Sequence, residues 1–492
     1  MKRILGLFFL CSMVFVVSAK TPKAKKSFSG PTRVDLTNLE NTFEKVDGIP
    51  LTLVTGANAI SSSGVYYIDD SKADADITIS ADNVVLDLRG RLVQSITVAG
   101  NFVKVLNGSV AYASNTAISA TGFHDIVFEN LFVENSGGTG TTYAVTFSMC
   151  SNVVYSNANM YGDAAQLLFD TCKSIDVRDL QILGSGAGSF DYCASMSLCS
   201  NISCRNISIS NQAPTYSPLY TFSSKNFVME DIIISQCSNG ANIGSIDLFS
   251  CSGGAMHNCS VEPTTNGYGV RLYNCLATSL DSCSVIGAAQ SGFTFAGDTS
   301  SVLVTNCLAA RNSLMGFAIS VNGTVDLYNC ISSNNTLDGI RIDGGSKISI
   351  DNCSCIDNAG NGITMEDSLV LDCTVENSLV TGNSGHGILV QDNGGGIPKQ
   401  GAIINNYVAS NTGEGIYLRS AGIFRFTVAD NKCIGNTVGV EQDAGSTGSN
   451  AIFNNVALAN SVNNYVNVSG TNICTLANLN AGTQTAWMNI QN

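Results

Sequence analysis

NCLAARNSLMGFAI (306–319), NCISSNNTLDGIRI (329–342), NCSCIDNAGNGITM (352–365) and NSLVTGNSGHGILV (377–390) repeat one pattern four times along the chain. Each copy starts with Asn, has a second Asn six residues later and a Gly four residues beyond that, and the copies begin 23 to 25 residues apart. The apolar residues after the Gly alternate as in a strand, and so short a unit has no room for a stable helix. The pattern therefore predicts a coil of short β-strands whose stacked turns bury a continuous core.

Residues equivalent to the leading Asn recur along most of the chain. The sixteen anchors are Asp87, Asn107, Asn130, Asn157, Asp179, Asn206, Gln236, Asn258, Ser282, Asn306, Asn329, Asn352, Asn377, Asn406, Asn431 and Asn455. At the spacing of paired strands, sixteen turns make one elongated domain about 75 Å long. Crossovers between parallel strands are almost always right-handed, so we expect a right-handed coil.

The segments that flank the repeats have their own patterns. Residues 1–19 combine a basic start, an apolar run and a small-residue exit, which is typical of a secretory signal peptide. Residues 20–54 form a lead in which positions 35–46 have helical apolar spacing, and this short amphipathic helix is expected to cap the first turn. Residues 471–492 break the repeat and are expected to cap the last one.

Two entry segments, SGVYYI (63–68) and ITISADNVVLDLRGR (77–91), carry a family resemblance together with the repeats. They resemble the right-handed parallel β-helix proteins of the pectate-lyase-like superfamily, and the resemblance covers residues 55–470. It implies an all-β, single-stranded parallel β-helix. It leaves activity open, because that superfamily includes lyases, hydrolases, epimerases, phage tailspikes and adhesins.

The charge balance narrows the class of partner. The chain has 24 basic and 38 acidic residues, and loss of Lys2 and Arg3 with the signal peptide leaves 22 − 38 = −16. Such a field repels phosphate backbones, so nucleic acid is excluded as a partner. No later segment has the roughly 18 apolar residues of a membrane helix. We expect a secreted or cell-surface protein, monomeric or alternatively trimeric, whose partner is a polysaccharide or a cell surface.

Asn and Cys recur in register, which indicates structural roles. Asn tolerates the left-handed backbone that a bend requires, and stacked Asn amides can bond from turn to turn. Seventeen of the 18 Cys lie beyond the signal peptide, and most fall into two columns. Stacked rows of this kind favour buried thiols over disulfides, and their spacing predicts no metal site. The columns are Cys237, Cys259, Cys283, Cys307, Cys330 and Cys353, and Cys150, Cys172, Cys199, Cys251 and Cys275.

The Gly-His-Gly element around His386 is similar to one signature of the polygalacturonases in that superfamily. The other elements of that signature, upstream and downstream, are missing here. In its own repeat His386 occupies the position of Asp338, Asn361 and Glu414, which favours a variable surface residue.

The residues that alternate outward after each repeat Gly form a stronger candidate site. Turns about 4.8 Å apart would bring their carboxylates and guanidinium groups within reach of one extended ligand. By the resemblance, a lyase would hold Ca²⁺ with Asp or Glu and use Arg as its base, and a hydrolase would use two carboxylates. An ordinary solvated face explains the same pattern. The catalytic candidates are Asp343, Glu366, Asp392, Arg419 and His386, and the binding candidates are Arg341 and Tyr417.

Three tyrosines lie where the repeat is longer than usual and loops are expected to leave the stack. Tyr192, Tyr216 and Tyr220 could stack on sugars or pack the loops down. The sequence therefore leaves three functions open. The first is an exported, non-catalytic β-helix that binds a glycan or partner surface, with no cofactor. The others are a polysaccharide lyase, hydrolase or epimerase, with Ca²⁺ if it is a lyase, and a structural or adhesive surface protein.

Overall fold

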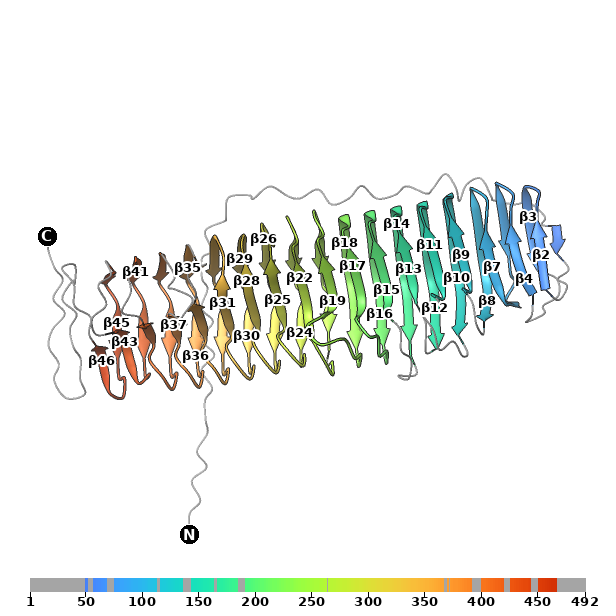
Figure 1. Cartoon of the computed structure of the whole chain (residues 1–492). Helices are drawn as coiled ribbons and strands as arrows, with labels where there is room; N and C mark the ends of the chain where they lie inside the picture. The colour runs from blue at the N-terminus through green and yellow to red at the C-terminus, as the bar shows by residue number, and fades with distance from the viewer. Residues whose placement is uncertain are drawn as a thin grey trace, which may run out of the picture.

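The molecule is a parallel β-solenoid, seen side-on in Figure 1. The computed structural model describes residues 49–51, 56–68, 75–112, 116–135, 143–162, 166–184, 191–262, 264–366, 370, 372–391, 400–419, 425–443 and 450–466. The predicted signal peptide, the helix at 35–46 and the cap at 471–492 lie outside these residues and stay predictions. The parallel coil itself is confirmed, because each described strand pairs in parallel with its equivalent in the next turn.

Each turn contributes one strand to sheet B. These strands are β2 (Gly56–Ile60), β4 (Ala75–Ile79), β7 (Ser95–Val98), β9 (Ile118–Thr121), β11 (Val145–Ser148), β13 (Leu167–Asp170), β15 (Tyr192–Ser197), β17 (Ser217–Phe222), β19 (Gly244–Phe249), β22 (Tyr268–Tyr273), β25 (Phe293–Gly297), β28 (Phe317–Val321), β31 (Ile340–Gly344), β34 (Ile363–Glu366), β37 (Ile388–Gln391), β40 (Ile416–Arg419), β43 (Val438–Gln442) and β46 (Asn463–Val466).

The rest of each turn belongs to sheet A. Its strands are β1 (Ile49–Leu51), β3 (Gly64–Ile68), β5 (Val84–Asp87), β6 (Leu92–Val93), β8 (Val103–Tyr112), β10 (His124–Asn135), β12 (Ser151–Gly162), β14 (Lys173–Leu183), β16 (Ser200–Ser210), β18 (Lys225–Ser235), β20 (Ala255–His257), β21 (Ser260–Val261), β23 (Ser279–Asp281), β24 (Ser284–Ile286), β26 (Val302–Thr305), β27 (Leu308–Ala310), β29 (Thr324–Tyr328), β30 (Ile331–Ser333), β32 (Lys347–Asp351), β33 (Ser354–Ile356), β35 (Cys373–Glu376), β36 (Leu379–Thr381), β38 (Gly401–Ile404), β39 (Tyr407–Ala409), β41 (Phe426–Ala429), β42 (Lys432–Ile434), β44 (Ala451–Phe453) and β45 (Val456–Leu458).

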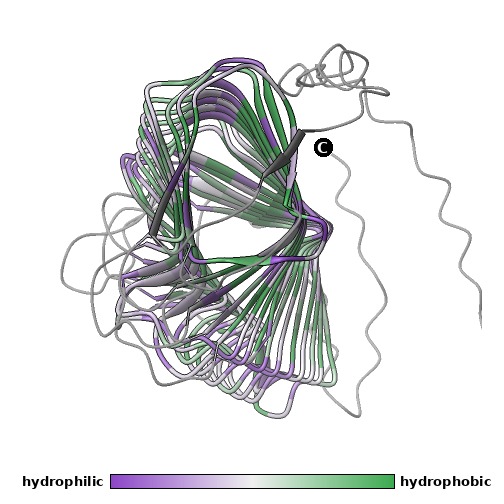
Figure 2. Ribbon diagram, turned by 90° about the vertical axis from the view of Figure 1, so that its right-hand side faces the viewer, coloured by the Kyte–Doolittle hydropathy of each residue, from purple (hydrophilic) through white to green (hydrophobic). Residues whose placement is uncertain are grey.

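The alternation read from the repeats places one set of side chains in the core. On β31, Ile340 and Ile342 are buried while Arg341 between them points outward. Seen along the axis, the turns superimpose, and bands of similar hydropathy run through neighbouring turns (Figure 2). The in-register stacking follows from the period of two in a strand, since a slip of one residue would exchange the two faces.

The leading Asn of each repeat forms an exposed ladder at the bend of sheet A. Asn306, Asn329 and Asn352 all have positive φ, between 54° and 55°, as the bend requires. The Asn329 amide donates to Asn306 Oδ1 at 2.7 Å and the Asn352 amide to Asn329 Oδ1 at 3.2 Å. The predicted asparagine ladder is therefore confirmed.

Five of the predicted anchors are displaced from this bend. At the first anchor the positive φ lies at Arg89 and Gly90, instead of at the predicted Asp87. The strand register puts the bend at Asn405, Asp430 and Asn454, one residue before the predicted Asn406, Asn431 and Asn455. It puts the bend at Asp231 instead of Gln236. In the three turns that bend at Asn405, Asp430 and Asn454, another Asn follows the true bend residue, so the sequence alone could not fix the register.

The second Asn of each repeat forms a buried ladder that explains the spacing to the Gly. Asn358 Oδ1 accepts the backbone N–H of Asn335 at 3.1 Å, and Asn383 Oδ1 accepts that of Asn358 at 3.0 Å. A Cβ on Gly339 would lie 2.8 Å from Asn358 Nδ2 and 2.6 Å from the carbonyl oxygen of Gly362. The repeat therefore needs Gly because the next turn's amide and backbone occupy that space.

The cysteine columns point into the core, as predicted, and the sixteen described Cys are free and buried. In the column beside Cys150, a Cys172 sulfur accepts the backbone N–H of Cys150 at 3.4 Å, while Ser224 Oγ accepts that of Cys199 at 3.0 Å. Thr299 Oγ1 likewise accepts the backbone N–H of Cys275 at 3.1 Å, so Cys, Ser and Thr fill one role in this column, which is to accept a backbone N–H from the preceding turn.

The first predicted column needs one correction. Cys237 lies two residues after Ser235, which pairs with Ser210, so it aligns with Gln212 and not with Cys259. The true column starts at Cys259 and continues beyond Cys353. In this column the side chain of each later member accepts the backbone N–H of the member before it. These later members are Ser378, Asn406, Asn431 and Asn455.

Candidate functional site

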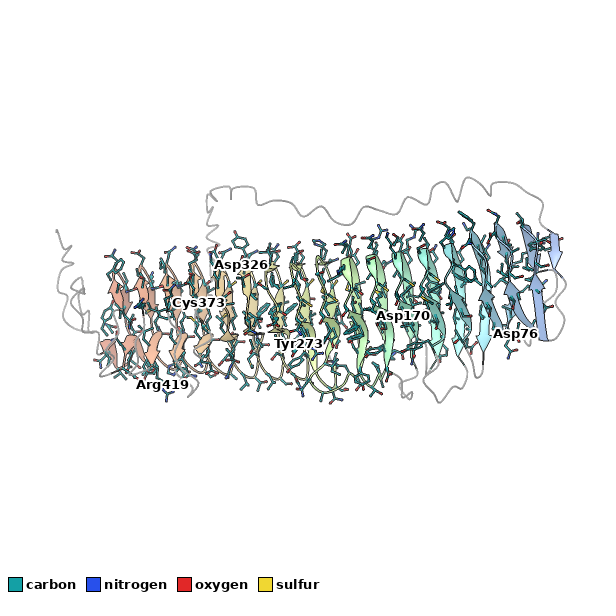
Figure 3. All side chains as sticks on the ribbon, turned by 45° about the horizontal axis from the view of Figure 1, so that its top comes forward. Asp76, Asp170, Tyr273, Asp326, Cys373 and Arg419 are labelled. Atoms are coloured by element: carbon teal, nitrogen blue, oxygen red, sulfur yellow. The ribbon has the colours of Figure 1, made fainter. Side chains whose placement is uncertain are left out.

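The outward face of sheet B carries every predicted site residue that the structure describes, apart from His386 and Tyr216 at its strand ends. Figure 3 labels Asp170, Tyr273 and Arg419, which belong to β13, β22 and β40 of this sheet. The candidates fall into two groups on this face. We call the group on β31 to β43 the polar row, and the group on β15 to β22 the aromatic row.

In the polar row, Arg341 joins two of the predicted carboxylates. Its Nε donates to Asp343 Oδ1 at 2.9 Å, and its Nη2 contacts Glu366 Oε1. Gln391 Nε2 donates to Glu366 Oε2 at 2.7 Å. Asp343 lies two residues after Arg341 on β31, so both side chains point to the same face of the strand.

This arrangement limits what Glu366 can do chemically. Its side chain is only 4% exposed, and both carboxylate oxygens are engaged by Arg341 and Gln391. Separating a buried carboxylate from its ion-pair partner costs free energy, because it leaves a buried charge without compensation. Glu366 therefore fixes the geometry of its neighbours and does not present a free carboxylate to a ligand.

The next turns of the polar row contain His386 and Tyr417. The two rings lie 5.2 Å apart, His386 contacts the Glu414 carboxylate, and the Tyr417 hydroxyl donates to Asp443 Oδ1 at 2.6 Å. Burial lowers the pKa of His386 and outweighs the raising influence of Glu414. Burial and the hydrogen bond to Asp443 raise the pKa of Tyr417.

The two remaining predicted residues of the polar row are Arg419 and Asp392. Arg419 pairs in register with Gln391, is exposed, and has no salt-bridge partner among the described residues. The Arg419 guanidinium therefore faces solvent, beside the hydrogen-bonded side chains of Gln391 and Glu366. Asp392 lies outside the described residues, and its assignment stays a prediction.

The aromatic row brings together the three predicted tyrosines. Tyr192 and Tyr220 stack at 4.5 Å between ring centroids with 10° between planes, and Tyr192 lies 5.6 Å from Tyr216. Residues 217–220, predicted to be in a loop, are part of strand β17. Because the rings cover one another's faces, they offer mainly edges and hydroxyls, while Tyr216 is 43% exposed. Burial raises the pKa of Tyr192 and raises that of Tyr220 to about 12.

The row continues through residues that the sequence analysis missed. Phe222, Phe249 and Tyr273 extend the stack, with centroids 5.7 and 5.0 Å apart. Beside them Arg271 donates twice to the buried Asp247, at 2.9 and 2.7 Å. Spacings of 27 and 24 residues between the three aromatic residues match one turn, and this signal was hidden by the misplaced anchor at Gln236.

Small side chains separate the two rows. In the outward column, Arg271 of β22 is followed by Thr294, Ala318 and then Arg341 of β31. Three steps of about 4.8 Å make this interval about 14 Å, and the whole face from β15 to β40 about 43 Å long. One extended chain molecule could therefore contact both rows.

The described residues contain no group of three or more His, Cys, Asp or Glu able to hold a metal ion. They also contain no helix that is long and apolar enough to cross a membrane.

Comparisons with known proteins agree with this fold. Residues 248–401 match the family model described as a right handed beta helix region. Among curated protein sequences none matches the chain. With the solenoid described above, the family match identifies a right-handed parallel β-helix and confirms the pectate-lyase-like resemblance at the level of the fold.

Solved structures of the same fold are distant in sequence. The A-module of mannuronan C-5 epimerase AlgE6 from Azotobacter vinelandii is 12% identical over 76% of this chain and 88% of its own, with a TM-score of 0.40. Pectate lyase Pel9A is 14% identical over 49% and 70%, with a TM-score of 0.35. The tailspike protein of E. coli bacteriophage HK620, in complex with a pentasaccharide, is 11% identical over 82% and 72%, with a TM-score of 0.30.

Proposed function

We propose that this protein is an exported β-helix that binds an extended, uncharged polysaccharide along the outward face of sheet B, without catalysing a reaction on it. The observation that carries the proposal is the alignment of the aromatic row and the polar row on one face, with small residues between them. Rigid scaffolds that hold polar groups and aromatic rings in fixed positions bind sugars at low entropic cost.

The polar row supports binding because its groups are held in place before a ligand arrives. Arg341, Glu366 and Gln391 fix one another, and Asp443 fixes the Tyr417 hydroxyl. Arg419 stays available to donate to sugar hydroxyls.

The charge of this face favours an uncharged ligand. The polar row contains five carboxylates, those of Asp343, Glu366, Glu414, Glu441 and Asp443, against two guanidinium groups, and the whole chain has a formal net charge of −14. An acidic polysaccharide would be repelled unless a cation bridged it to the protein.

Binding can be tested with the mature chain, residues 20–492, by affinity electrophoresis in gels containing glucomannan, xyloglucan, starch, alginate or polygalacturonate. We expect retardation by a neutral polymer, weakened at least about fivefold by Tyr216→Ala or Arg419→Ala. Lys432→Ala on sheet A is the matched control, since Lys432 is an exposed cation on the opposite sheet. The proposal is wrong if no polymer retards the protein, or if the sheet B variants behave like the control.

A catalytic alternative is favoured by one observation, the contact between a His386 of lowered pKa and the Tyr417 ring. An imidazole and a phenol side by side can exchange protons with a sugar, as a polysaccharide lyase or epimerase requires. Turnover measured as unsaturated ends at 235 nm, with and without Ca²⁺, and lost in His386→Ala and Tyr417→Phe, would replace the binding proposal by this one.

A further inference from the structure

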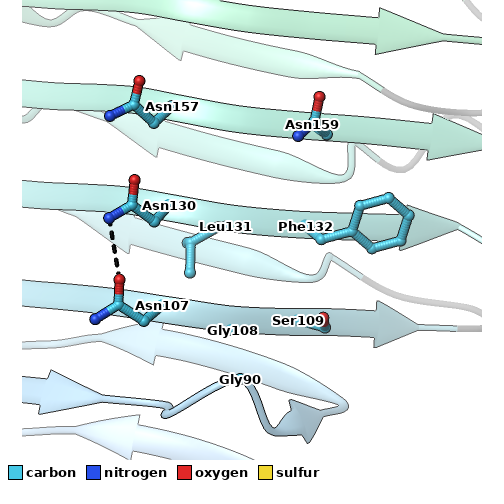
Figure 4. Close-up of a pocket in the computed structure, with 9 residues that line it drawn as sticks. All are labelled: Gly90, Asn107, Gly108, Ser109, Asn130, Leu131, Phe132, Asn157 and Asn159. Carbon is cyan, nitrogen blue, oxygen red and sulfur yellow. Dashed lines mark hydrogen bonds between the residues drawn. The ribbon is translucent and has the colours of Figure 1, made fainter.

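A shallow groove of about 440 Å³ lies on the other sheet, at the N-terminal end of the solenoid (Figure 4). It spans β8, β10 and β12 and is lined by Gly90, Asn107, Gly108, Ser109, Asn130, Leu131, Phe132, Asn157 and Asn159. We propose that this groove is a second binding site, for a neutral oligosaccharide of two or three units, independent of the face of sheet B.

Two columns of side chains build the groove. Asn107, Asn130 and Asn157 stand at the bend of sheet A, and the Asn130 amide donates to Asn107 Oδ1 at 3.0 Å. Phe132 pairs in register with Asn159 on the next turn. Three turns cover about 10 Å, which suits two or three sugar units.

The fold does not require the residues of the second column. Asn157 has φ of 48°, so the bend itself explains an Asn there. Asn159 has no such φ and lies in a strand, where Asn is normally depleted. Phe132 beside it is 40% exposed, although aromatic side chains are stabilised by burial.

The chemistry of the lining matches an uncharged sugar. A pyranose has an apolar face of C–H groups, for which the exposed Phe132 ring is a partner, and an edge of hydroxyls. The exposed amides of Asn157 and Asn159 have no hydrogen-bond partner among the described residues, so each offers two donors and an acceptor. No lining residue is ionisable. Of the charged groups nearby, Lys104 and Glu129 form an ion pair at 3.1 Å, and the Asp87 carboxylate accepts the Asn107 amide at 3.3 Å.

Gly90 keeps one end of the groove open. It has φ of 74°, and a Cβ added there would meet no atom within 4 Å. The left-handed φ favours Gly at this position, and the space around it is open.

The test is a titration of the mature protein with cellotriose, maltotriose, mannotriose, xylotriose and chitotriose up to about 10 mM, followed by ligand-observed NMR. We expect one trisaccharide to bind with millimolar affinity, at least about tenfold more weakly in Phe132→Ala and measurably more weakly in Asn159→Ala. Ile233→Ala is the matched control, because Ile233 occupies the same column four turns away and is 46% exposed.

Two results would overturn the proposal. One is the absence of binding by all five trisaccharides. The other is binding that Phe132→Ala and Asn159→Ala leave unchanged, with circular dichroism showing folded variants. Loss of binding in Tyr216→Ala or Arg419→Ala, with Phe132→Ala unaffected, would assign the sugar to sheet B alone.

Discussion

Replacement of Asn358 by Ala tests how much the buried asparagine ladder stabilises the solenoid. Its side chain is fully buried and takes part in four hydrogen bonds. It accepts from the backbone and the amide of Asn335 at 3.1 and 2.9 Å, and donates to Ser332 O and Asn383 Oδ1 at 3.1 and 3.0 Å. Alanine leaves the buried Asn335 N–H without its acceptor, and such an orphan costs about 1–3 kcal/mol. With the lost bonds, we expect the free energy of unfolding to fall by about 3 kcal/mol.

Urea denaturation followed by circular dichroism measures the change, and hydrogen exchange of residues 329–365 locates it. Long repeat arrays need not unfold in one step, so protection should fall most in the turns next to Asn358. Asn322→Ala is the control, because the side chain of the exposed Asn322 donates to Asp298 Oδ1 at 2.8 Å and its loss should cost under about 0.5 kcal/mol. If Asn358→Ala cost no more than this control, the ladder would not be a source of stability.

Two further predictions concern the thiols and the half-buried phenol of Tyr220. A thiol reagent should label few cysteines of the native mature protein, because the sixteen described Cys are free and buried. It should label most of them after denaturation without reductant. Protection that persists in denaturant would show disulfides instead. Because burial raises the pKa of Tyr220 from 10.0 to about 12, its protonated form stabilises the fold fully below pH 10, and that contribution is lost as pH rises towards 12. The difference in unfolding free energy between wild type and Tyr220→Phe should change across this pH range, and a constant difference would contradict the assignment.

The sequence was sufficient for the fold because the repeat carries its own register. Alternating residues such as Ile340 and Ile342 identified the core, and the spacing between repeats identified the turn. The sequence was insufficient where a polar residue next to the bend resembles the Asn that begins each repeat. Asn406 and Asn431 look like bend residues, but they extend the buried column that contains Cys353.

The candidate site was predicted only in part. Arg341, Asp343 and Glu366 were expected on one face and do meet there. That Glu366 is buried and engaged on both oxygens by Arg341 and Gln391 could not be read from spacing, because it depends on side-chain conformation and burial. The groove around Phe132 was missed because it is formed by a bend, and exposure at a bend is set by the three-dimensional path of the chain.

The cysteine columns have a consequence for how the chain reaches its native state. Consecutive members from Cys259 to Cys353 are 23 or 24 residues apart, a separation at which two ends of an unfolded chain meet readily. In an oxidising compartment, thiols that have not yet been buried can pair at random and trap the chain before its turns stack. In the proposed exported state, closure of the coil therefore competes with oxidation of the thiols. The yield of refolded protein should be higher in reducing buffer than in an oxidising glutathione mixture, because the sixteen described Cys are free in the native state.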